Sequence, residues 1–148
     1  MTVAALRVGS VIVLFCLFVT YGGTGKNLAR GNQYYQSGQY NKAIAAYKRA
    51  LNEGENSALS RFNLANAYYQ IQEYSRAIGN YKAATLEATD FTRAWINLGV
   101  MYHEMGDHGA SIAALEQARR LEAEDVMVYQ FLLLHIWHLK STAKLPLI

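Results

Sequence analysis

The sequence predicts an all-α fold of stacked helical hairpins, an α-solenoid, and three observations support this prediction. Only one of the 148 residues is Pro, and a scarcity of Pro favours long helices. The segments 24–57, 58–91 and 92–125 are recognisable copies of one another, which is typical of repeat architectures. Within each copy, apolar and small residues recur at every third or fourth position, which is the period of amphipathic helices.

The chain begins with a targeting segment, residues 1–23. Arg7 precedes an almost wholly apolar run over 8–19, and small residues follow it, an order typical of export signals. Two interpretations stay open. A cleaved signal peptide fits the length of the apolar run, whereas an uncleaved single-pass anchor over 3–21 comes close to the ~20 residues that a membrane helix needs. Both place the protein at or beyond a membrane, and we expect a bacterial envelope.

Comparison of the chain with itself reveals the repeat. Sliding 24–57 onto 58–91 aligns eleven identical pairs, and a second shift of the same length keeps five in 92–125. The first-shift pairs are Asn32/Asn66, Tyr34/Tyr68, Tyr35/Tyr69, Gln36/Gln70, Tyr40/Tyr74, Ala43/Ala77, Ile44/Ile78, Tyr47/Tyr81, Lys48/Lys82, Ala50/Ala84 and Glu53/Glu87. Each segment predicts two helices separated by a polar turn, at 37–39, 72–73 and 106–107. One such hairpin cannot bury its apolar face alone, so we expect neighbouring hairpins to stack.

These residues resemble the tetratricopeptide repeat family, whose first helix carries Trp or Leu, Leu, Gly or Ala, and Tyr, and whose second carries Ala, an aromatic residue and Ala. The matching residues are Gly31, Tyr34, Ala43, Tyr47 and Ala50; then Leu64, Ala65, Tyr68, Ala77, Tyr81 and Ala84; then Trp95, Leu98, Gly99, Tyr102 and Ala118. The resemblance implies a right-handed superhelical array of three repeats that binds proteins and is not an enzyme. Glu55, Thr89 and Ala123 replace the family's Pro near the end of each unit.

A helix over 126–140 starts where a fourth unit would begin, and 141–148 forms a tail. The resemblance implies that this helix caps the array. A cap normally carries a polar outer face, yet this segment is apolar nearly throughout and too short to span a bilayer. It is therefore either a well-buried cap or an exposed apolar patch for a partner, a second copy or the membrane surface.

In the resembled family, the first helices of successive units line a concave groove that holds an extended peptide or a partner helix. The partner-binding residues carried over by position are Asn32, Tyr35, Gln36, Phe62, Asn63, Asn66, Tyr69, Gln70, Arg93, Asn97 and His103, with Ile96, Val100 and Glu104 beside them. Amides donate and accept hydrogen bonds, so they can pair with any peptide backbone, and Tyr adds rigid apolar area. The alternative is a polar row that is merely solvated.

Some family members clamp a C-terminal carboxylate in this groove. Asn32, Asn63 and Arg93 match three positions of that clamp, but Leu28 and Asn97 replace basic residues that it uses. This departure argues against a clamp of that kind here.

The sequence predicts no cofactor, no metal site and no nucleic-acid binding. A net charge of +3 is too small for a nucleic-acid surface. His103 and His108 are five residues apart rather than the four of a zinc-binding helix, and the turn at 106–107 interrupts the helix between them. His135 and His138 are three apart, without a carboxylate or thiol nearby in the sequence.

These observations predict a membrane-targeted scaffold that binds a protein or an extended peptide in its groove and supports the assembly of a membrane or envelope complex. The alternative is a self-assembling structural protein. It would associate through the apolar C-terminal helix, or through the charge gradient along the three units, whose net charges are +3, zero and −3.

Overall fold

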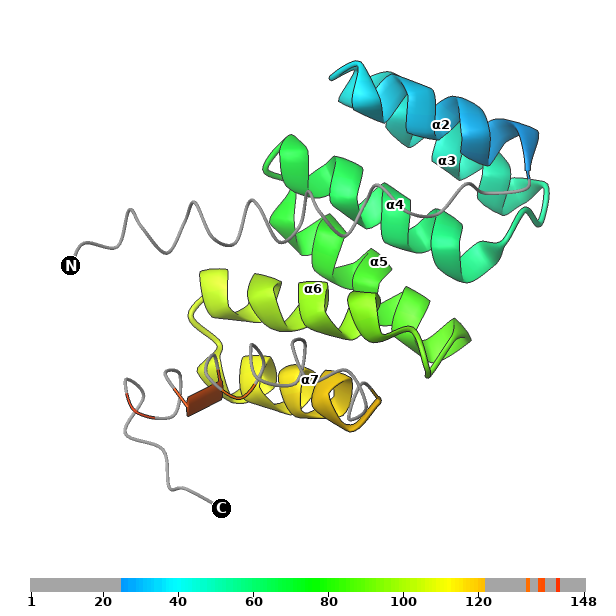
Figure 1. Cartoon of the computed structure of the whole chain (residues 1–148). Coiled ribbons are helices and arrows are strands. Elements are labelled where there is room, and N and C mark those ends of the chain that lie inside the picture. The colour runs from blue at the N-terminus through cyan, green and yellow to red at the C-terminus, as the bar shows by residue number, and fades with distance from the viewer. Residues whose placement is uncertain (1–24, 122–132, 134–135, 138–140, 142–148) are drawn as a thin grey trace. The chain divides into compact units, whose positions relative to one another are not determined.

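A computed structural model of the chain describes residues 25–121, 133, 136–137 and 141, and over these residues the protein is entirely α-helical (Figure 1). The prediction of an all-α fold is confirmed. Two compact units divide the chain, residues 1–87 and 88–148. The first contains α2 to α5 and the second contains α6 and α7. The helices are α2 (Lys26–Gln36), α3 (Tyr40–Asn52), α4 (Ser57–Gln70), α5 (Tyr74–Glu87), α6 (Thr92–Glu104) and α7 (His108–Leu121).

The predicted targeting segment 1–23 lies outside the described residues, and so does most of the predicted cap (126–140) and tail (141–148). Among the helices that the structure describes, none combines the length and apolar character that crossing a bilayer requires.

The turn inside each hairpin repeats with the period of the sequence. Gly38, Gln72 and Gly106 each follow a first helix at equivalent positions of the repeat, and each has a positive φ, of 73°, 63° and 79°. Gly adopts this left-handed conformation without steric cost, whereas Gln72 does so as a non-glycine residue. The same backbone reversal therefore closes all three hairpins, with or without the favoured residue.

Close contact between the two helices of a hairpin depends on a small residue in the first helix. A Cβ atom on Gly31 would lie only 2.4 Å from the Tyr47 ring, and one on Gly99 would lie 2.7 Å from the Leu115 side chain. Tyr47 and Leu115 are fully buried, so neither can move aside. Ala65 and Tyr81 hold the equivalent places in the second hairpin and are also fully buried.

The N-terminus of α2 is capped from outside the helix. Its N-cap residue, Gly25, makes no side-chain hydrogen bond. Instead, the Glu55 carboxylate accepts from the backbone N–H of Asn27 (3.0 Å) and of Leu28 (2.8 Å). Those N–H groups have no partner inside the helix, and a negative charge is favourable at a helix N-terminus. Glu55 thus ties the end of the first hairpin back to its beginning.

Two further contacts occur in both hairpins of the first unit. Asn27 donates to Glu53 through its side-chain amide, and the equivalent Arg61 forms an ion pair with Glu87. A cation also stacks on the Tyr of each first helix. Lys42 lies 5.7 Å from the Tyr34 ring centroid, and Arg76 lies 5.6 Å from that of Tyr68. The identity between the first two copies of the repeat is therefore also an identity of contacts.

Gly31→Ala should destabilise the protein, whereas Gly79→Ala should stabilise it. The new methyl group at Gly31 would overlap the buried Tyr47 ring, and overpacking of this kind costs ~1–3 kcal/mol. Gly79 lies inside α5 with open space around it, so Ala there should add ~0.5–1 kcal/mol through helix propensity. Urea denaturation of the two variants measures both effects. Equal changes in the free energy of unfolding would contradict the close-contact explanation.

Glu55→Gln should flatten the loss of stability in acid. Burial alone would raise the pKa of the Glu55 carboxyl, but the hydrogen bonds from Asn27 and Leu28 lower it below its ordinary value of 4.5. A lowered pKa in the folded state contributes stability above pH 4.5 that is lost as the pH falls through the folded-state pKa. Glu73→Gln, in an exposed ion pair with Arg76, controls for the removal of one charge. Parallel pH profiles for the wild type and Glu55→Gln, measured by thermal melts, would rule out the cap.

Candidate protein-binding face

The predicted groove residues of the first unit lie on its first helices, α2 and α4. Two hydrogen bonds join these helices directly. Asn63 Nδ2 donates to Asn32 Oδ1 at 3.0 Å, and Gln70 Nε2 donates to the Tyr35 hydroxyl at 3.2 Å. We call this surface the α2–α4 face. Its residues are Asn32, Tyr35, Gln36, Phe62, Asn63, Asn66, Tyr69 and Gln70.

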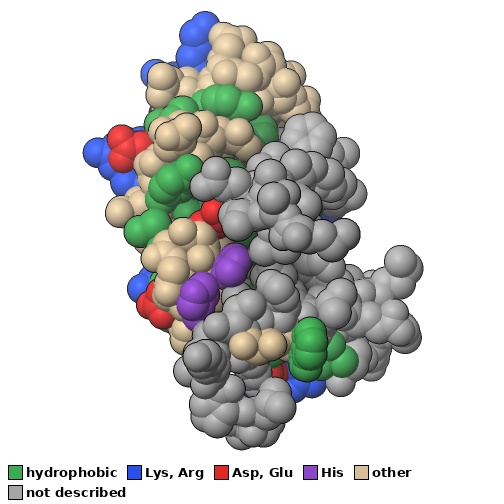
Figure 2. All heavy atoms as spheres, turned by 90° about the vertical axis from the view of Figure 1, so that its left-hand side faces the viewer, with side chains coloured by type: hydrophobic (Ala, Val, Ile, Leu, Met, Phe, Trp, Pro, Cys, Tyr) green, Lys and Arg blue, Asp and Glu red, His purple; other side chains and the backbone are tan. Residues whose placement is uncertain are grey.

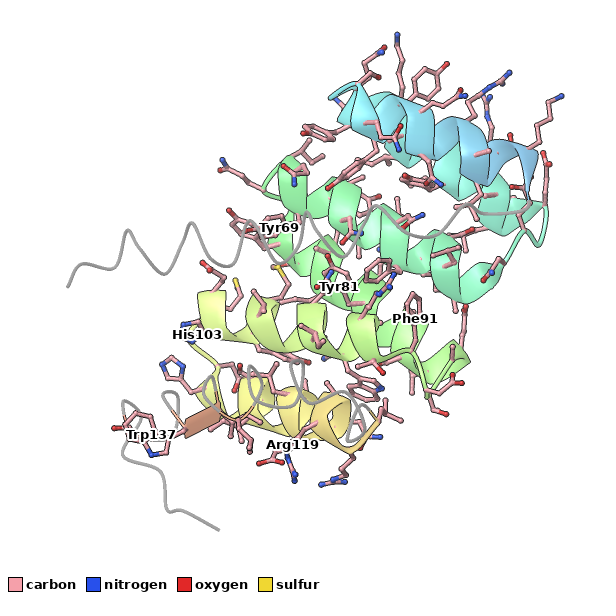
Figure 3. The ribbon with its side chains drawn as sticks, viewed as in Figure 1. Tyr69, Tyr81, Phe91, His103, Arg119 and Trp137 are labelled. Atoms are coloured by element: carbon pink, nitrogen blue, oxygen red, sulfur yellow. The ribbon has the colours of Figure 1, made fainter. Side chains whose placement is uncertain are left out.

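A Tyr–Asn hydrogen bond fastens the two helices of each hairpin in this unit. The Tyr47 hydroxyl donates to Asn32 Oδ1 at 2.9 Å, and the Tyr81 hydroxyl donates to Asn66 Oδ1. Both tyrosines are fully buried, and burial raises the pKa of the Tyr47 hydroxyl far above its ordinary value. Figure 3 labels Tyr81, which reaches from α5 towards α4. The predicted face is therefore partly structural, because two of its amides hold hairpins together.

The third hairpin replaces both members of this pair at once. Val100 and Leu115 stand one repeat after Asn66 and Tyr81, and both are buried. A buried hydroxyl or amide that loses its partner is costly, whereas an apolar pair has nothing to satisfy. The joint change is the substitution pattern expected if the two positions face each other.

Burial separates the α2–α4 face into a foundation and a rim. The foundation is Phe62, Asn63 and Asn66, whose side chains are only 2–3% exposed. Tyr35 belongs with it at 6% exposed, and burial raises the pKa of its hydroxyl to about 12. The rim consists of residues that are half-buried or exposed, namely Asn32, Gln36, Tyr69 and Gln70.

An aromatic pair supports the rim at the end of each first helix. Tyr35 and Tyr40 meet edge to face with ring centroids 5.3 Å apart, and Tyr69 and Tyr74 lie 5.8 Å apart in the next hairpin. Tyr69 lies near the end of α4 on this face (Figure 3). Because each ring is held against another, the contact fixes its orientation.

The remaining predicted residues lie on α6, in the second unit. Asn97 is fully buried, whereas Arg93 and His103 are half-buried. Beside them, Ile96 and Val100 are buried and Glu104 is exposed. Ser111 Oγ donates to the Gly99 carbonyl at 2.7 Å and joins α7 to α6, so a Ser replaces the family's Ala without loss of contact.

The turn between α6 and α7 also brings two histidines together. His103 and His108 have their Nδ1 atoms 3.4 Å apart and their ring centroids 5.4 Å apart. Figure 2 shows the two imidazoles side by side at the surface. The helix does break between them, as expected, but the tight turn at Gly106 returns the chain to the end of α6. The two rings are therefore close in space although the helix is interrupted between them.

Two family profiles cover the repeats. One described as "TPR repeat" matches residues 31–72, and one described as "Tetratricopeptide repeat" matches residues 62–126. The chain belongs to the tetratricopeptide repeat (TPR) family. No curated protein sequence matches it.

Solved TPR structures agree with this fold. The chain is 27% identical to MamA, over 80% of this chain and 67% of that one, with a TM-score of 0.70. It is 26% identical to the second TPR domain of human RPAP3, solved with an HSP70 peptide, over 74% and 91% of the chains at a TM-score of 0.65. PcrH, solved with the chaperone-binding region of PopD, shares the fold at 16% identity, over 80% and 91%, at a TM-score of 0.73.

Asn66→Val and Tyr81→Leu should be strongly coupled. Either change alone removes the hydrogen bond but leaves one buried polar partner, at a cost of ~1–3 kcal/mol. The double variant copies the apolar pair of the third hairpin, so its cost should fall short of the sum by ~0.5–3 kcal/mol. Chemical denaturation of all four proteins of the cycle measures this. Asn41→Val, on the exposed side of α3, is the control and should add to Tyr81→Leu without coupling.

Proposed function

We propose that this TPR protein is a membrane-held scaffold that binds an extended segment of a partner protein on its α2–α4 face. Through that binding it supports the assembly of a membrane or envelope complex. The observation that carries the proposal is the division of the face into a fixed foundation and an accessible polar rim.

The rim offers both kinds of hydrogen-bonding group. Asn32 Oδ1 accepts from Tyr47 and from Asn63, which uses its two lone pairs and orients the amide. Among the described residues nothing accepts from the Asn32 Nδ2 donors. Gln70 donates to Tyr35, and within the same part of the chain its side-chain carbonyl has no donor. An oriented donor and an acceptor on adjacent helices suit the alternating N–H and C=O groups of an extended backbone.

The rim has no basic side chains at the two clamp positions, and this favours an internal peptide segment over a C-terminal carboxylate. At the two clamp positions where related proteins carry basic residues, Leu28 and Asn97 are fully buried. The matching Asn63 already donates a hydrogen bond to Asn32. At these positions a terminal carboxylate would therefore meet no cation, and the one matching amide named here already donates to another side chain. An internal peptide segment, recognised through its backbone and by apolar contact with Tyr69, fits better.

Known complexes of similar proteins support a peptide ligand. The RPAP3 domain was solved with an HSP70 peptide and PcrH with a region of PopD. Those ligands belong to those proteins, and this chain is at most 26% identical to either. Their contribution to the proposal is the class of partner, a polypeptide segment.

The membrane part of the proposal is supported by the sequence of residues 1–23, with its basic, apolar and small-residue order. As a single-pass anchor or as a signal peptide, this segment would place the repeats at a membrane, in a bacterial envelope. Cell fractionation of the full chain tests it. Recovery of the uncleaved protein in the cytosolic fraction would overturn this part alone.

Photo-crosslinking should place a partner on the rim. A photoreactive residue at Gln36 is expected to give a discrete adduct in cells, whereas one at the exposed Asn41 of α3 should not. Tyr69→Ala should weaken the Gln36 adduct without unfolding the protein, because Tyr69 is only half-buried. Asn66→Ala is unsuitable as a binding test, since Asn66 is buried and bonded to Tyr81. Equal adducts at both sites, or an adduct indifferent to Tyr69→Ala, would move binding away from this face.

A second candidate function is self-assembly, and one observation favours it. Leu133 and Trp137 are 41% and 60% exposed, whereas Ile136 is 4% exposed. Two large apolar side chains at the surface suit contact with another copy. Sedimentation of the full chain in detergent tests this. Trp137→Ser should dissociate an oligomer, and a monomer at all protein concentrations would exclude self-assembly.

A further inference from the structure

The turn between α6 and α7 places two histidines face to face, and we propose that they bind a divalent transition-metal ion such as Zn²⁺. His103 lies in the last turn of α6 and His108 is the first residue of α7. Their Nδ1 atoms are 3.4 Å apart. This inference is independent of the peptide-binding proposal, because it concerns a pair of imidazoles on a different unit.

The distance between the two nitrogens suits one shared ion. Zn²⁺ binds imidazole nitrogen at ~2.0–2.1 Å and prefers tetrahedral geometry, which places two ligand nitrogens about 3.4 Å apart. The observed Nδ1 to Nδ1 distance is 3.4 Å. An ion between the rings would therefore need little rearrangement of either side chain. The same distance without metal corresponds to a weak N–H···N contact between neutral rings.

The backbone of the turn holds both ligands in place. The Gly106 N–H donates to the His103 carbonyl at 2.9 Å, and the Asp107 N–H donates to the Tyr102 carbonyl at 2.9 Å. The Asp107 carboxylate caps α7 by accepting from the Ala110 N–H at 3.0 Å. Both imidazoles are half-buried, so they are ordered yet reachable from solvent.

The ligand set determines which ions fit. The two imidazoles supply two ligands, and over the described residues no group of three or more His, Cys, Asp or Glu side chains could hold a metal. Imidazole ligands suit Zn²⁺, Cu²⁺, Ni²⁺ and Co²⁺, whereas Mg²⁺ and Ca²⁺ prefer oxygen. The site should therefore not bind Mg²⁺. A bound ion would join the end of α6 to the start of α7 and stiffen the hairpin.

Zinc titration of the full chain in detergent tests the site. Calorimetry should show one equivalent of Zn²⁺ per chain and no heat with Mg²⁺. His103→Asn and His108→Asn should each abolish this binding, because a single imidazole holds the ion by one bond only. The double variant His135→Asn/His138→Asn is the matched control, since it removes the chain's other two histidines, and it should bind as the wild type does.

A second measurement needs no variant and so does not depend on folding. In ¹⁵N NMR spectra of the wild type, Zn²⁺ should shift the Nδ1 resonances of His103 and His108 and leave their Nε2 resonances much less affected. Absence of stoichiometric binding would overturn the proposal. Binding that persists in both single variants, or that disappears only in the control, would overturn it as well.

Discussion

The fold of this chain depends on the close contact between a bulky side chain of one helix and a Gly or Ala of its partner. Tyr47 lies against Gly31, and Leu115 lies against Gly99, at distances that leave no room for a methyl group. Helices that approach this closely bury their side chains on both sides of the contact, and packing at such density is where most helical stability originates. The Tyr–Asn hydrogen bond, the aromatic pairs and the turn geometry all presuppose that approach.

Periodicity is the reason why so much of the fold could be predicted from the sequence. Eleven identities at one constant spacing reveal which positions are equivalent, and the positive φ of Gln72 could be anticipated from Gly38 and Gly106 by that equivalence. A contact that occurs in a single hairpin cannot be predicted from the repeat, because no equivalent positions point to it. Glu55 caps α2 from 27 and 28 residues away, and it does so at a position where the family has Pro. Nothing in the repeat pattern indicates this cap.

The candidate site was predicted less completely, for a reason that lies in the chemistry of Asn and His. Sequence reasoning treats Asn as a surface residue, yet Asn63 and Asn66 are 3% exposed because each is bonded to a nearby side chain. The hydrogen-bond partners of Asn63 and Asn66, which lie on α2 and α5, become identifiable only when the positions of these helices beside α4 are known. Likewise, the sequence predicts the helix break between His103 and His108, but the distance between their rings is set by the three-dimensional course of the turn.

The third hairpin shows that the buried pair between the two helices of a repeat can change from polar to apolar. Val100 and Leu115 replace the Asn–Tyr pair together and are both buried, so two apolar side chains take the place of a hydrogen-bonded pair. On the α2–α4 face the half-buried or exposed side chains are Asn32, Gln36, Tyr69 and Gln70, and two of these also bond to other helices, Asn32 to Tyr47 and Gln70 to Tyr35. Under the proposed function, a partner would be recognised through these accessible side chains, whereas the buried ones hold the helices together.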